Sequence, residues 1–223
     1  MFITGNLFAD PQTVNSCTVA MEKLPFSPAR LSIYPDGKNK RVNVLCDFET
    51  DGGGWTVIQK RTSGPKQEFN KTWDEYSKGF GTPDGNFWLG LDNIHALTKN
   101  GDQELRIELE DFEGDKRYAK YSRFSVSDAS DFYRLTISGF SGDSTAGDSM
   151  TIVASYTSNG MRFSTRDKDN DNNSRYNCAA SYGAWWVSEN ITQNKSFFNP
   201  KLTHSKKHTA NHEHLKIIKK DKK

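Results

Sequence analysis

Hydrophobic and polar residues alternate along several segments of the chain, and this alternation predicts β-strands. The segments are 31–34, 41–48, 55–61, 103–112, 116–126 and 131–140. Turn sequences such as Pro-Asp-Gly, Asp-Gly-Gly-Gly and Glu-Gly-Asp-Lys separate them. A period of two turns one face of each strand toward a core and the other toward solvent. The pattern therefore predicts a twisted antiparallel sheet.

Two short segments between the strands, 72–81 and 91–101, have helical patterns, and Gly101 is the expected C-cap of the second. The glycines at 52–54 are expected to supply positive φ angles and to leave room for Trp55 to enter the core. A sheet of this kind combined with a few short helices predicts the α+β fold class.

Three parts of the chain lack such patterns. Residues 1–30 contain three prolines and are expected to be irregular. Residues 141–180 are rich in glycine, serine, aspartate and asparagine, and a long irregular stretch of this kind is usually functional. After Trp186 the glycines and tryptophans disappear, so residues 187–223 are expected to be a basic, disordered tail or a marginal helix.

Composition and charge narrow the classes of function. The 223 residues, 34% of them hydrophobic and 12% aromatic, can form one large core. The net charge is +2, but nine lysines and three acidic residues after Trp186 leave the preceding part with a net charge of −4. This balance does not indicate nucleic-acid binding. No apolar run approaches the roughly 18 residues of a membrane span.

The segment 166–178, RDKDNDNNSRYNC, places three aspartates at alternate positions without a basic partner beside each. In a looped backbone such carboxylates can converge on one cation, and Ca²⁺ accepts about 6–8 oxygen ligands. The EF-hand pattern is not met, because the sixth position from Asp167 is Asn172 and the twelfth is Cys178. A solvated surface loop is the alternative that the spacing leaves open.

Several motifs in order along the chain resemble the fibrinogen-related domain, the C-terminal module of fibrinogen chains, ficolins, tachylectins, tenascins and angiopoietins. They are CDFETDGGGWTVIQKR (46–61), NFWLGLDNIHALT (86–98), ELRIELEDFEGDKRYAKYSRFSV (104–126), FSTRDKDND (163–171) and NCAASYGAWW (177–186). The resemblance predicts an irregular segment at 1–14, the domain at 15–186, incomplete at its C-terminus, and the tail at 187–223.

The resemblance implies a single structural Ca²⁺ site in the acidic segment. The implied ligands are the carboxylates of Asp169 and Asp171 and main-chain carbonyls around Asn173 and Arg175, with Asp167 as a neighbour. Two carboxylates imply a weak Kd, on the order of 10⁻⁴–10⁻³ M, as in extracellular modules. The ion would hold the loop beside a ligand pocket and would not activate water.

The resemblance also implies a disulfide between Cys17 and Cys46, which contributes roughly 3–4 kcal/mol. Cys178 has no such partner, because the later cysteine and the Asn-Leu-Asn-Gly stretch of the family are missing after Trp186. Translation of a retained intron is one hypothesis for this loss, since the next two residues, Val-Ser, are those that a splice-donor hexamer encodes. Sequencing of the transcript across this boundary tests it.

The region beside the loop corresponds to the pocket that binds acetyl groups in lectins of the family. The residues expected to contact a ligand are Tyr176, Asn177, Cys178, Ala179 and Tyr182. Tyr182 could equally be a core residue, whereas Trp185 and Trp186 are expected to pack in the core.

The remaining signals are weaker. Asn70, Asn172, Asn190 and Asn194 each begin an N-glycosylation sequon, a triplet that is common by chance. Histidines at four-residue spacing in the tail could bind Zn²⁺, but no second shell supports them. His95 is the lone histidine before the tail and is expected to be structural. We therefore expect no enzymatic activity.

The function expected is calcium-dependent extracellular recognition, as a lectin of innate immunity that binds N-acetylated carbohydrates. The alternatives are a matrix or receptor-signalling protein that binds an extracellular protein with the same face, and a truncated product without a complete pocket. The protein is expected to be secreted, although no signal peptide is visible in this chain. Oligomers would form through regions absent from this chain.

Overall fold

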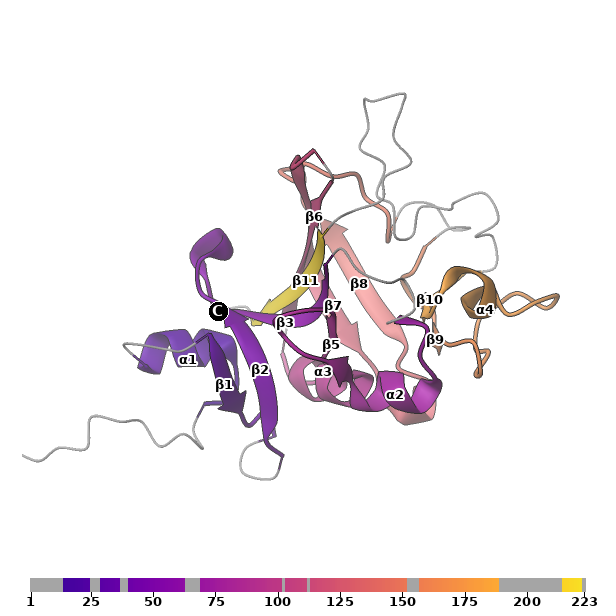
Figure 1. The fold of residues 1–223 in the computed structure, drawn as a ribbon, viewed down its shortest axis with the longest axis horizontal. Coiled ribbons are helices and arrows are strands. Elements are labelled where there is room, and N and C mark those ends of the chain that lie inside the picture. Colours follow the sequence, from indigo (N-terminus) through magenta and orange to yellow (C-terminus); the bar gives the residue numbers. More distant parts are fainter. Residues whose placement is uncertain are drawn as a thin grey trace, which may run out of the picture.

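The computed structural model contains one large antiparallel sheet (Figure 1). It describes residues 14–24, 29–36, 40–62, 69–101, 103–111, 113–151, 157–188 and 214–221. The strand order is β1-β2-β3-β11-β6-β7-β8, and β5 pairs with both β3 and β4. The strands are β1 Arg30–Ile33, β2 Val42–Asp47, β3 Trp55–Arg61, β4 Phe80–Gly81, β5 Phe87–Trp88, β6 Gln103–Glu110, β7 Lys116–Val126, β8 Leu135–Phe140 and β11 His214–Asp221.

Short helices and a second, two-stranded sheet accompany the large sheet. They are α1 Cys17–Lys23, η2 Thr50–Gly52, α2 Trp73–Lys78, α3 Leu91–Thr98, η4 Ala129–Asp131, β9 Phe163–Ser164, α4 Cys178–Tyr182 and β10 Trp185–Trp186. The pairing of β9 with β10 is antiparallel. This architecture confirms the predicted α+β class, and α2 and α3 fall within the two segments predicted to be helical.

Strand β11 corrects, for residues 214–221, the prediction that residues 187–223 form a disordered tail or a marginal helix. It lies in the large sheet between β3 and β6, with Ile217 opposite Gln59 and Ile107 (Figure 1). The prediction rested on composition, but a central strand is held by backbone hydrogen bonds to both neighbours, whatever its charge. The folded domain therefore does not end at Trp186, and the boundary predicted there is wrong.

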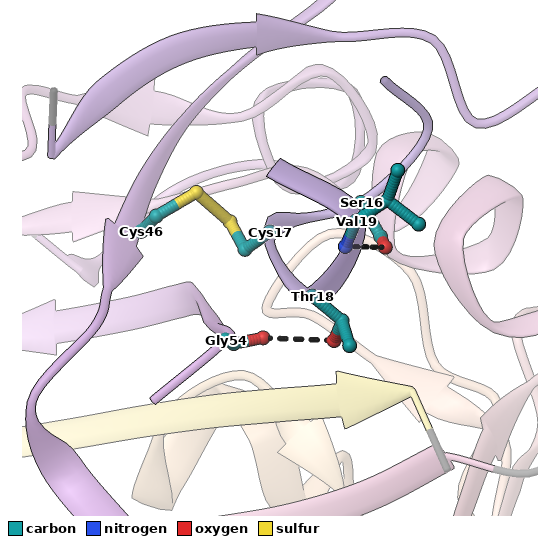
Figure 2. The surroundings of a disulfide bond; sticks show 6 residues. All are labelled: Ser16, Cys17, Thr18, Val19, Cys46 and Gly54. Atoms are coloured by element: carbon teal, nitrogen blue, oxygen red, sulfur yellow. Dashed lines mark hydrogen bonds between the residues drawn. A yellow bond between two sulfur atoms is a disulfide. The ribbon is translucent and has the colours of Figure 1, made fainter. Parts of the chain in front are cut away.

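Helix α1 is a second correction, because residues 1–30 were expected to be irregular. The helix begins after Ser16, whose Oγ accepts a hydrogen bond from Val19 N at 3.2 Å. Thr18 Oγ1 donates to the carbonyl of Gly54 at 3.1 Å (Figure 2). Gly54 has a φ of +77°, and a Cβ at this position would lie 3.2 Å from the Thr18 Cα. The close approach of helix and turn therefore requires glycine at position 54.

A disulfide joins α1 to β2 through Cys17 and Cys46, as the resemblance implied (Figure 2). The two Cα atoms are 5.5 Å apart, within the usual range for a disulfide. Both side chains are buried in the core. The bond ties the first described helix to the sheet, while Cys178 stays a buried free thiol.

Aromatic side chains fill the core beside the second sheet. The centroid of the Phe163 ring lies 6.0 Å from that of Trp88 and 4.9 Å from that of Trp186. Trp186 is buried, and its Nε1 donates to the Tyr133 carbonyl at 2.6 Å. Trp185 is buried as well, which confirms that both tryptophans pack in the core.

The glycine turn before β3 admits Trp55 to the core, and His95 has a structural role, as expected for both. Residues 52–54 all have positive φ angles, and Trp55 directly after them is completely buried. His95 on α3 places Nδ1 2.8 Å from the carbonyl of Val126 on β7. The His95 contact thus joins α3 to the sheet.

Candidate functional site

The aspartate-rich loop leads from β9 to α4 and is held by asparagine side chains. Asn170 Nδ2 donates to the Phe163 carbonyl at 2.8 Å, and Asn170 N donates to Ser164 Oγ at 3.0 Å. Near the other end, Asn177 Nδ2 donates to the carbonyl of Thr165 at 2.9 Å. Asparagine side chains can take the place of backbone partners where the chain has little regular structure. The loop is therefore anchored at one end to β9 and at the other to Thr165, the residue that follows β9.

The Asp171 carboxylate lies close enough to Asp169 to affect the ionisation of Asp169. Loss of solvation and the charge of Asp171 together raise the pKa of Asp169. Asp171 Oδ1 accepts from Asn173 N at 2.7 Å, and Asp171 Oδ2 accepts from Cys178 N at 2.8 Å. Within the part of the chain that the structure describes, neither carboxylate forms an ion pair. Two acids thus share one turn without a cationic partner there.

This donor set fits a hard cation. A carboxylate oxygen that accepts one hydrogen bond keeps a further lone pair, and carboxylates are preferred ligands of Ca²⁺. Asn173 and Arg175, the expected carbonyl ligands, follow in a turn where Asn173 Oδ1 accepts from Arg175 N at 2.9 Å. The described residues include no group of three His, Cys, Asp or Glu side chains suited to a metal, so a site here depends on main-chain oxygens. The ligand set remains a prediction.

Asp167 and Lys168 fasten the loop to helix α2. The Asp167 carboxylate accepts from Trp73 N at 3.0 Å and from Thr165 Oγ1 at 2.8 Å. Lys168 Nζ lies 4.1 Å from the centroid of the Trp73 ring and 5.3 Å from that of Phe132, within the range of cation–π attraction. The sequence offered no signal for these contacts, because Trp73 and Asp167 are 94 positions apart.

Helix α4 begins where the loop ends. Asn177 is its N-cap, and the Asn177 Oδ1 accepts from Ala180 N at 2.9 Å. Cys178 is completely buried, and burial followed by the negative charge of Asp171 raises the pKa of its thiol to about 12. Such a thiol is protonated at neutral pH and is a poor nucleophile. Cys178 and Ala179, two of the residues expected to contact a ligand, are both buried, so their side chains are not exposed at the surface of this face.

The two tyrosines of the candidate site lie at the surface. Tyr176 is 37% and Tyr182 40% exposed, and the other exposed large hydrophobic residue in the described ranges is Met21 at 46%. Loss of solvation, followed by the electrostatic effect of Tyr182, raises the pKa of the Tyr176 phenol. Met21 belongs to α1, which lies at the opposite end of the molecule from α4 (Figure 1). The exposed aromatic surface is therefore concentrated beside the acidic loop.

The fold and these motifs define the class of protein. Residues 13–216 match the family model of the C-terminal globular domain of fibrinogen beta and gamma chains, and the chain belongs to this family. The match confirms the resemblance and continues past Trp186 into β11. It therefore supports the strand, and not the predicted boundary, at that end of the domain.

Among curated proteins, the tenascin of Gallus gallus is 43% identical over 185 residues, which cover 82% of this chain. The same residues cover 10% of tenascin, so the chain spans about a tenth of the length of that relative. Whatever the rest of tenascin does lies outside this similarity.

Solved structures show the same fold. The fibrinogen-like globe domain of human ANGPTL2 has a TM-score of 0.76 and 30% identity, with 93% of this chain and 99% of that chain covered. The fibrinogen-like globe domain of human ANGPTL6 has a TM-score of 0.74 and 31% identity, with 94% of this chain and 96% of that chain covered. Lamprey fibrin D-dimer, in complex with the peptide Gly-His-Arg-Pro-amide, has a TM-score of 0.72 and 26% identity, with 99% and 77% covered.

These similarities place the chain among fibrinogen-like domains of the kind found in tenascin and in angiopoietin-like proteins. Within the residues that the structure describes, no helix has the length and apolar character needed to cross a membrane.

Proposed function

We propose that this chain is a non-catalytic extracellular recognition module that binds its ligand on the face formed by the acidic loop and α4. The observation that carries this proposal is the position of the exposed tyrosines. Tyr176 is exposed near the end of the loop that carries Asp169 and Asp171, and Tyr182 is exposed on α4, the helix that follows this loop. Exposed aromatic rings beside polar groups are typical of recognition surfaces. The buried, protonated Cys178 gives this face no activated nucleophile.

The binding face depends on calcium in this proposal. Asp169 and Asp171, together with main-chain oxygens of Asn173 and Arg175, would hold the ion, whose charge offsets the repulsion between the carboxylates. Asp171 also accepts a hydrogen bond from Cys178 N, the first residue of α4. The conformation of the loop is thereby linked to the start of the helix that carries Tyr182.

An acetylated carbohydrate is the ligand class that the exposed groups of this face suit. Flat phenol rings pack against the apolar faces of sugar rings, and the tyrosine hydroxyls offer hydrogen bonds to acetamido and hydroxyl groups. This ligand class also agrees with the family's lectins, which the sequence resembles in the same segment.

A basic segment of an extracellular protein is the second candidate. The lamprey fibrin structure similar to this chain contains the peptide Gly-His-Arg-Pro-amide, which carries an arginine and a free amino group. The acidic loop complements a cationic segment, and aromatic rings attract guanidinium groups.

Secretion is part of the proposal, and the disulfide supports it. A disulfide between buried cysteines persists in oxidising compartments and is rare in the cytosol. The family match and the bond between Cys17 and Cys46 therefore both favour an extracellular location.

Two affinity surfaces test the function and separate its candidates. The chain is passed in millimolar Ca²⁺ over immobilised N-acetylglucosamine and, in parallel, over immobilised Gly-His-Arg-Pro-amide. The chain should be retained on one of the two surfaces, and a chelator should abolish this retention. If the protein is a lectin, free N-acetylglucosamine should elute it from the sugar surface. If it binds a basic protein segment, free peptide should elute it from the peptide surface. The Tyr176→Ala and Tyr182→Ala variants should lose retention, whereas Met21→Ala, an exposed residue at the far end, should keep it. Equal retention of all three variants would place the ligand elsewhere.

A further inference from the structure

Asn70 is an exposed residue just before helix α2, and it begins the sequon Asn70-Lys71-Thr72. We propose that Asn70 carries an N-linked glycan in the secreted protein. The inference rests on the secretion that the proposed function requires, since N-glycosylation occurs on chains that enter the secretory pathway. It does not depend on the calcium loop or on any ligand.

The structure holds the backbone in place on both sides of Asn70. Before it, Phe69 is 9% exposed, and its carbonyl accepts a hydrogen bond from the Tyr76 hydroxyl at 2.8 Å. After it, Thr72 is the N-cap of α2, and Thr72 Oγ1 donates to Glu75 Oε2 at 2.9 Å. A buried residue and a helix cap thus flank one exposed asparagine. The asparagine is therefore accessible from solvent at a position that is held on both sides.

The Asn70 amide forms no hydrogen bond with any residue that the structure describes. A glycan on Nδ2 therefore displaces no interaction of the folded domain within those ranges. Glycans are bulky and need a surface position of this kind. The sequon at Asn70 therefore lies at a position that can carry an N-linked glycan.

The second sequon in the described ranges provides an internal comparison. Asn172 lies inside the acidic loop, and its Nδ2 points to Met161 Sδ at a distance of 3.6 Å. The adjacent residues Asp171 and Asn173 accept the backbone hydrogen bonds that shape the loop. A glycan on Asn172 would have to turn that amide away from Met161. The geometry therefore favours Asn70, while Asn190 and Asn194 lie outside the described residues.

The modification is a group transfer from a polyprenyl-diphosphate-linked oligosaccharide. A bond forms between Asn70 Nδ2 and the anomeric carbon of the first N-acetylglucosamine. The bond from that carbon to the diphosphate oxygen breaks, and the lipid diphosphate leaves with the electron pair. The amide nitrogen gives up one proton to a base of the transferase. No oxidation or reduction occurs.

The test expresses the full chain behind a cleavable leader in a eukaryotic secreting cell and maps occupancy at Asn70 by mass spectrometry. Peptides are compared before and after release of glycans by an amidase that converts the modified asparagine to aspartate. Thr72→Ser keeps both the sequon and the helix cap. Thr72→Asn keeps a good N-cap but removes the sequon, and Asn70→Gln removes the acceptor.

The expected result is occupancy at Asn70 in the wild type and in Thr72→Ser, and loss of one glycan in Thr72→Asn and Asn70→Gln. Because the cap is preserved, Thr72→Asn should melt at the temperature of the Asn70→Gln variant. Unmodified Asn70 in both the medium and the cell-retained protein overturns the inference. A glycan at Asn70 on a protein that neither affinity surface retains would support this inference while contradicting the proposed function.

Discussion

Removal of the disulfide between α1 and β2 is expected to destabilise the domain by several kcal/mol. Cys17 and Cys46 are separated by 29 positions, and closing a loop of this size in the unfolded chain corresponds to roughly 3–4 kcal/mol. Alanine at both positions leaves the core apolar, so the loss of the cross-link should dominate. For a domain of this size, about 2–4 °C of Tm accompanies each kcal/mol, which gives a fall of roughly 6–16 °C.

Urea denaturation of the Cys17→Ala/Cys46→Ala variant and of the wild type measures this difference. Cys178→Ala is the matched control, because Cys178 is equally buried but forms no cross-link. A reductant should lower the stability of the wild type and of Cys178→Ala toward that of the double variant, which should not respond. A loss below about 1 kcal/mol, or equal responses to the reductant, would refute the reasoning about the cross-link.

The remaining predictions concern the sheet and the loop. Ile217→Pro removes a backbone donor from a strand between two neighbours and should unfold the domain in circular dichroism, whereas folded Ile217→Pro protein would contradict the position of β11. Asp171→Ala should cost roughly 1.5–3 kcal/mol in urea denaturation and abolish the response to Ca²⁺, because two backbone donors lose a charged acceptor. Asp167→Ala should cost about 0.5–2 kcal/mol and keep that response, since Asp167 bonds the first turn of α2. The pKa of Asp169 is higher in the folded protein than in the unfolded chain, where it is about 3.9. Without Ca²⁺, protonated Asp169 therefore stabilises the folded state at pH values below about 3.9, and this stabilisation is lost as pH rises through the folded pKa. Since protons compete with the ion, calorimetric titration should find weaker Ca²⁺ binding as pH falls toward that value, and stronger binding there would contradict the assignment.

The strands and the helices with local patterns could be predicted from the sequence. The alternation in β6 and β7 and the glycine turn before Trp55 are short-range signals, and each was confirmed. The pairing of Cys17 with Cys46 followed from the family resemblance, because three cysteines alone leave the connectivity open.

Features that depend on distant partners could not be predicted. β11 has a charged sequence, and its place in the sheet follows from the edges that β3 and β6 present to it. The contact of Lys168 with Trp73 joins segments that no local pattern relates. The burial of Cys178 follows from its place in the core, which its sequence neighbours do not indicate. The acidic loop itself was evident from its composition, but its anchoring by Asn170 and Asn177 was not.

Thermal melting with and without calcium tests most directly whether the acidic loop is a metal-dependent recognition site. With a Kd on the order of 10⁻⁴–10⁻³ M, Ca²⁺ at about 10 mM should stabilise the domain by roughly 1.4–2.7 kcal/mol. This corresponds to a rise in Tm of roughly 3–11 °C. The rise should be absent in the Asp169→Ala/Asp171→Ala variant and should persist in Asp167→Ala. Identical melting curves of the wild type with Ca²⁺ and with a chelator would contradict the account.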